Sequence, residues 1–128
     1  MTFPASHQDL LDAAGVTVVS TLTPSGAIQS TAVWFLFDEG QLKFSFSDAR
    51  AKLKNLQKNA TVNAYFLDPA NPFRFLEVRG TVTITPDPDK SFAKKVGDKY
   101  GADIRNFDQP GDQRFVVTVN PTKVNASA

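Results

Sequence analysis

The sequence predicts a mainly β fold, a small split β-barrel with short helices, in a single domain that spans residues 1–128. Two observations predict it. Residues 74–85 ("RFLEVRGTVTIT") alternate strictly between the two faces expected of a long strand. Shorter β-branched or aromatic runs recur along the rest of the chain, separated by turn-forming proline, glycine and aspartate. Six strands with three short helices favour a mainly antiparallel barrel.

Each element follows from a local signal in the chain. An opening helix begins at the N-cap residue Ser6 and ends at Gly15, with His7 at the surface. A second helix is indicated by Ala49, Leu53 and Leu56, which share one helical face after an N-cap at residue 47 or 48. A third helix is expected over residues 87–100. The expected strands cover residues 16–23, 28–37, 41–47, 61–67, 74–85 and 114–119, of which the second and third form a hairpin.

Composition excludes several classes of protein. The 14 Lys and Arg residues nearly balance the 13 Asp and Glu residues, so the overall charge does not favour a nucleic-acid partner. The absence of cysteine excludes disulfides and thiolate chemistry and fits a reducing compartment. No signal peptide and no apolar run of about 18 residues is visible, so we expect a cytoplasmic protein that does not associate with membranes.

Positive charge is concentrated in one segment, residues 48–58, which contains four cations and one anion. In the strand before it, Leu42, Phe44 and Phe46 share one face, and Ser45 and Ser47 lie on the other. The two serines lead into the N-terminus of the basic helix, where free N–H groups favour an anion. With the charges of Arg50 and Lys52, this arrangement predicts a site for a phosphate-bearing ligand. The alternative is a solvated amphipathic helix whose lysines only keep it soluble.

A second unusual feature is the outward face of residues 73–81. Leu76, Val78, Val82 and Ile84 form the predicted interior row, whereas Phe73, Phe75 and Arg79 point the other way. Exposed phenylalanines indicate a covered surface, either a subunit interface or a patch under a loop of the same chain. Trp34 also has two possible roles. It could be an aromatic residue at an interface or stacked on a ligand, or it could be an ordinary core residue.

Catalytic groups are scarce. His7 is the only histidine, and no histidine–carboxylate cluster suggests a metal site or a serine triad. No glycine-rich phosphate loop is present. Reactive chemistry, if there is any, therefore comes from a cofactor.

Four passages in order carry a family resemblance. They are "VVSTLTPSGAIQSTAVWFLFDEGQLKFSF", "ARAKLKNLQKNATVNAYFLD", "RFLEVRGTVTITPD" and "RFVVTVNPTKV". The set resembles the split β-barrel flavin and deazaflavin proteins related to pyridoxamine 5′-phosphate oxidase, and most of all the actinobacterial branch that uses coenzyme F-420.

The resemblance implies a cofactor site made of several segments. It places the cofactor phosphate and adjoining chain at Ser45, Ser47, Arg50, Ala51 and Lys52, and the ring along Ser30, Thr31, Ala32 and Val33. Lys54 and Asn55 match the same motif. The resemblance also implies a homodimer with the cofactor between subunits, which would account for the outward Phe73, Phe75 and Arg79.

The function implied is a deazaflavin (coenzyme F-420)-dependent oxidoreductase that passes a hydride to an electron-poor planar acceptor. Two alternatives remain. One is an oxidoreductase of the pyridoxamine phosphate oxidase type that uses FMN, and the other is a carrier that binds the cofactor without turnover. No residue decides between the two cofactors, and the substrate does not follow from the resemblance.

Overall fold

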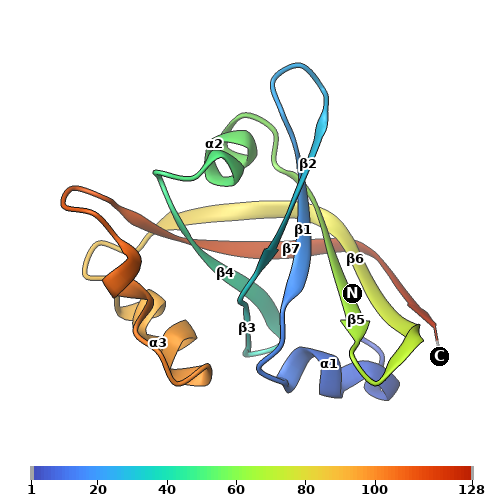
Figure 1. Ribbon diagram of the computed structural model, residues 1–128. Coiled ribbons are helices and arrows are strands. Elements are labelled where there is room, and N and C mark those ends of the chain that lie inside the picture. The colour runs from blue at the N-terminus through green and yellow to red at the C-terminus, as the bar shows by residue number, and fades with distance from the viewer. Residues whose placement is uncertain (1, 128) are drawn as a thin grey trace.

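The computed structural model describes residues 2–127 and contains one curled antiparallel sheet that forms a half-barrel (Figure 1). Its seven strands lie in the order β2-β1-β5-β6-β7-β4-β3. The predicted fold class is confirmed. The strands are β1 Thr17–Leu22, β2 Ile28–Val33, β3 Leu36–Asp38, β4 Gln41–Ser47, β5 Thr61–Asp68, β6 Asn71–Pro86 and β7 Arg114–Ser127. The helices are α1 Gln8–Asp12, α2 Ala51–Lys58 and α3 Ser91–Lys99, with short 3-10 segments η1 Ala5–His7 and η2 Ile104–Phe107.

The predicted single strand over residues 28–37 is wrong, because the chain breaks at Trp34 and Phe35. β2 pairs with β1 and β3 pairs with β4, so this segment supplies both edges of the sheet. The break is stabilised from outside the sheet. The Tyr100 hydroxyl accepts the Phe35 N–H at 3.2 Å and donates to the Gly15 carbonyl at 2.6 Å. Phe35 itself is buried edge-on against Phe66.

The three helices begin later than predicted because side chains and turns occupy the preceding residues. Ser47 accepts the Ala49 N–H on its hydroxyl and the Arg50 N–H on its carbonyl, so α2 starts only at Ala51. In the same way the Asp87 carboxylate accepts the N–H groups at the start of α3, which begins at Ser91. The opening segment consists of η1 followed by α1.

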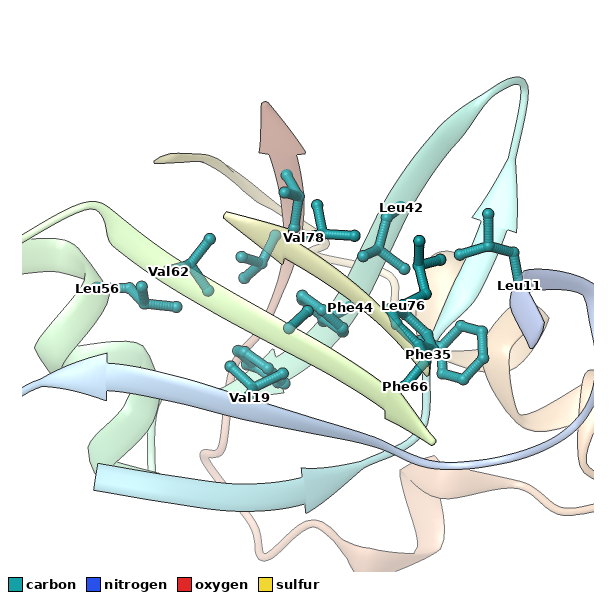
Figure 2. Close-up of a cluster of buried hydrophobic side chains, with 14 of the residues drawn as sticks. Leu11, Val19, Phe35, Leu42, Phe44, Leu56, Val62, Phe66, Leu76 and Val78 are labelled. Carbon is teal, nitrogen blue, oxygen red and sulfur yellow. The ribbon is translucent and has the colours of Figure 1, made fainter. Parts of the chain in front are cut away.

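The core lies inside the curl of the sheet. Figure 2 shows Leu42, Phe44, Leu76 and Val78 together in this interior, and Phe46 is buried there as well. The face assignment for β4 and β6 is confirmed, although Val82 and Ile84 are only partly buried. Alternation predicted these faces because side chains in a strand have a period of two.

His7 is not the surface residue that the sequence suggests, since it is only 4% exposed. Its Nε2 lies 2.8 Å from the Ser127 carbonyl, which can only accept, so Nε2 carries the proton. In the neutral ring Nδ1 then accepts from the Ser6 hydroxyl at 2.8 Å. The histidine therefore ties η1 to the end of β7. No helix among residues 2–127 has the length and apolar character needed to cross a bilayer.

Candidate functional site

A cavity of about 280 Å³ opens where the end of β4 and the start of α2 meet α3 and η2. In Figure 1, α2 and α3 are separate on the left side of the sheet, with β4 running between them. The cavity has a polar, cationic end formed by Ser45, Ser47, Arg50, Lys52 and Arg114. Its other end is apolar and is formed by Val16, Trp34, Val96, Ile104 and Phe107. Ala32, Val33 and Phe46 complete the wall.

Three cations crowd the polar end. Burial lowers the pKa of Lys52 below its usual range, and the neighbouring charges of Arg50 and Arg114 lower it further. The Lys52 ammonium lies 5.2 Å from the centre of the Phe46 ring. Within residues 2–127, neither Arg50 nor Lys52 has a carboxylate partner. An anion bound here would relieve both the repulsion and the burial cost.

The two serines add hydrogen-bonding capacity. The Ser45 Oγ is buried and has no hydrogen-bond partner among the described residues. Buried hydroxyls are normally bonded, so an unpaired one beside a cavity suits a ligand. The Ser47 Oγ accepts from the Ala49 N–H at 3.1 Å, which leaves its hydroxyl proton free to donate. Hydroxyl donors beside cations match the oxygens of a phosphate.

Arg114 is a site residue that sequence reasoning missed. It begins β7 and pairs across the sheet with Ser47, and its side chain is 11% exposed. Its guanidinium donates to the Ser45 carbonyl at 3.2 Å and to the Asp108 carboxylate at 2.7 Å. Asp108, whose side chain is 4% exposed, also accepts from Lys90 at 2.9 Å. Ser45 and Ser47 lie in a distant segment, so only the β4–β7 register, which the sequence does not reveal, could have indicated that Arg114 joins this site.

The cavity brings together six of the predicted site residues, namely Ala32, Val33, Ser45, Ser47, Arg50 and Lys52. Other predicted residues nearby do not line it. Ser30 shares a hydrogen bond with Ser20 on β1, and Thr31 and Ala51 are not in the lining. Lys54 is exposed on α2. Asn55 is buried and donates to Thr21 and Gln29, so it holds α2 against β1 and β2.

Phe73, Phe75 and Arg79 lie on the outer face of the sheet and do not line the cavity of their own chain. Phe73 is 78% exposed, and Phe75 stacks on Tyr65 with ring centres 5.3 Å apart. Arg79 pairs with Glu77 and lines a second hollow of about 430 Å³. The structure therefore does not bring these three side chains to the predicted site within one chain.

The described residues offer no metal centre. Among residues 2–127, no group of three or more histidine, aspartate or glutamate side chains is placed to hold an ion. The donor chemistry of the cavity is that of hydroxyls and cations, which suits an anionic organic ligand.

A family model and a solved structure each match nearly the whole chain. The family model for pyridoxamine 5′-phosphate oxidase matches residues 3–128. A solved structure described as an F-420 reductase is 34% identical, with a TM-score of 0.84, over 96% of this chain and 98% of that one. No curated protein matches the chain.

More distant structures share the fold alone. A conserved hypothetical protein from Mycobacterium tuberculosis is 19% identical, with a TM-score of 0.78, over 99% of this chain and 85% of that one. The haem storage protein of Vibrio cholerae is 14% identical, with a TM-score of 0.76, over 99% of this chain and 96% of that one.

Proposed function

This chain belongs to the pyridoxamine 5′-phosphate oxidase family, and we propose that it is a deazaflavin (coenzyme F-420)-dependent oxidoreductase that reduces an electron-poor planar acceptor. The observation that carries the proposal is the cavity, in which two unpaired cations and two serines adjoin an apolar wall. The 34% identity to an F-420 reductase over nearly the whole of both chains supports the choice of cofactor.

The residues present fit such a cofactor. Arg50, Lys52, Ser45 and Ser47 would hold its phosphate, and Ala32 and Val33 would lie against its ring. A reduced deazaflavin supplies a hydride when it is bound. The protein orients the reactants and excludes water, which accelerates reactions without an acid–base pair. No histidine or carboxylate lines the cavity within residues 2–127, so these residue types do not supply the proton that completes a reduction.

The charge on α2 supports the deazaflavin over FMN. Arg50, Lys54 and Lys58 are exposed at intervals of four residues, so they follow one side of the helix. They present more positive charge than one terminal phosphate requires. The deazaflavin continues beyond its phosphate into a tail with several carboxylates, which this row would attract. Exposed pairs contribute only about 0–1 kcal/mol each, so we expect a modest preference that fades as salt rises.

A titration with both cofactors tests the proposal. We expect coenzyme F-420 to bind more tightly than FMN at low salt, with a smaller difference at high salt. Arg50→Ala and Lys52→Ala should each weaken coenzyme F-420 binding tenfold or more, because a charge-assisted hydrogen bond contributes about 1.5–3 kcal/mol. Lys58→Ala, at the exposed end of α2, removes one solvated charge of the row and should weaken binding by about fivefold at most, which sets the reference for an exposed cation.

The outcomes separate the alternatives. Tighter FMN binding at both salt concentrations would favour an FMN oxidoreductase of the pyridoxamine phosphate oxidase type. Tight coenzyme F-420 binding without oxidation by quinone, nitro or conjugated-enone acceptors would favour a carrier. Unchanged dissociation constants in both charge variants would remove the phosphate assignment.

The protein is also proposed to be a homodimer. The outer face of β1, β5 and β6 carries Val18, Tyr65, Leu67, Phe73 and Phe75, and three of these are exposed large apolar side chains. Contiguous apolar surface of this kind is typical of an interface. Phe73, Phe75 and Arg79, which the family resemblance assigns to the cofactor, also lie outside the cavity of their own chain. A second subunit would complete the site.

We expect light scattering to report a dimer at micromolar concentration. Phe75→Asp should dissociate it, because the charge would be buried in the interface. A wild-type monomer would contradict the dimer and would remove Phe73, Phe75 and Arg79 from the cofactor site, leaving only the residues of one chain.

A further inference from the structure

The apolar end of the cavity suggests what the enzyme reduces. Its wall consists of Val16, Trp34, Val96, Ile104 and Phe107, and none of these carries charge. It is continuous with the cationic end, where the proposed function places a phosphate. A ligand in the apolar end would therefore lie beside a cofactor held at the other end.

Trp34 forms a fixed part of this wall. Its indole stacks on the Tyr100 ring with centres 4.3 Å apart and planes 3° from parallel. The Tyr100 hydroxyl is itself held by the backbone at the β2–β3 break, through Phe35 N–H and the Gly15 carbonyl. One face of the indole is therefore occupied, and the part of the side chain that lines the cavity is what a flat ring bound there would contact. Parallel or edge-on contact with an aromatic ligand is favoured at such a surface.

Phe107 forms the lip of the same end. It is 61% exposed although its segment is fixed on both sides. Before it, Asp103 accepts the Arg105 N–H and pairs with the Arg105 side chain, which lowers the pKa of Asp103 to about 2. After it, Asp108 is buried between Lys90 and Arg114. Because Phe107 also lines the cavity, its exposed ring is available to contact a ligand bound there.

We propose that Trp34 and Phe107 bind a flat, uncharged aromatic acceptor between them, as the substrate subsite. The inference rests on the proposed function. It adds the chemical class of the acceptor and the residues that select it. Tyr100 acts as a positioning residue, since it contacts Trp34 and not the cavity. A charged acceptor would lose solvation at this end without gaining a partner.

The test uses Trp34 as the reporter, because it is the only tryptophan in the chain. Nitrobenzene, a flat uncharged ring that quenches indole fluorescence, is titrated into the full chain without cofactor. We expect saturable quenching with an unchanged fluorescence lifetime, which indicates a bound complex. Phe107→Ala should weaken the apparent affinity at least fivefold. Ile28→Ala removes an apolar side chain that is 75% exposed at the start of β2, outside the cavity, and should leave the affinity unchanged.

A second arm separates the two ends of the cavity. Saturating inorganic phosphate and the Lys52→Ala variant should leave nitrobenzene binding unaffected. Quenching that never saturates, equal affinity in wild type and Phe107→Ala, or displacement by phosphate would overturn the subsite. The coenzyme F-420 titration is an independent measurement. Coenzyme binding without saturable quenching overturns only the subsite, and saturable quenching without coenzyme binding overturns only the proposed function.

Discussion

Replacing Asp108 with asparagine is expected to lower the free energy of unfolding by about 3 kcal/mol, the low end of the range for breaking a buried ion pair. The carboxylate is buried and holds both Arg114 and Lys90. Asparagine keeps the volume and one acceptor oxygen but leaves the Arg114 guanidinium without a counter-charge. Lys90 is more exposed and can turn to solvent, so most of the cost falls on Arg114. Urea unfolding measures the loss, and Asp98→Asn, at an exposed pair on α3, is the control.

The same variant has a defined pH dependence. Burial raises the pKa of Asp108, but hydrogen bonds from Arg114 and Lys90 outweigh it and leave the pKa below its ordinary value of 3.8. The stabilisation is therefore complete above pH 3.8 and is lost as the pH falls through the folded-state pKa. The difference in unfolding free energy between wild type and Asp108→Asn should shrink over that range. A constant difference would show that the loss is steric and not electrostatic.

Asp108→Asn should also affect the cavity. Because Asp108 neutralises Arg114, its replacement adds one net positive charge at the end lined by Ser45 and Lys52. Inorganic phosphate should then raise the melting temperature of the variant by more than that of the wild type, since binding to the folded state stabilises it. We therefore expect the Asp108 carboxylate to raise the stability of the fold and to lower the affinity of the cavity for anions.

The faces of the strands could be predicted from the sequence because alternation has a period of two and requires no knowledge of partners. The interior positions of Phe44, Leu76 and Val78 follow from it. The break at Trp34 and Phe35 could not be predicted, because both halves of residues 28–37 are strand-forming. What interrupts them is the Tyr100 hydroxyl from a distant helix end. Local patterns do not report such long-range hydrogen bonds.

The candidate site could also be predicted only in part from the sequence. Ser45, Ser47, Arg50 and Lys52 come from one continuous segment, so strand and helix geometry place them together. Arg114 depends on the register of β7 against β4. Phe107 and the Trp34 wall depend on how α3 and η2 pack beside the sheet. The sequence therefore predicted the cationic end of the cavity, whereas its apolar end required the tertiary structure.

Gly80→Ala is expected to destabilise the fold strongly. Gly80 lies in β6 at the irregularity after Arg79, between β5 and β7. A methyl group there would lie 2.1 Å from the Asn120 carbonyl oxygen and 3.0 Å from the Pro121 Cα. Both are backbone atoms and cannot rotate away, so β7 must move. Overpacking typically costs 1–3 kcal/mol, and we expect about 3 kcal/mol or more because the longest strand pairing is displaced.

Gly15→Ala is the matched control for this substitution. Nothing lies within 4 Å of the added methyl group at Gly15, and its backbone is not in the left-handed region. There the loss of backbone freedom in the unfolded chain should leave stability unchanged or raise it by about 0.4–1 kcal/mol. In thermal and urea unfolding, Gly80→Ala should therefore be less stable than the wild type, whereas Gly15→Ala should be as stable as the wild type or slightly more stable. Equal stability of Gly80→Ala and wild type would mean that β6 and β7 are not packed as closely as the 2.1 Å approach requires. It would also weaken the β4–β7 register that brings Arg114 to the cavity, because β7 pairs with both β6 and β4.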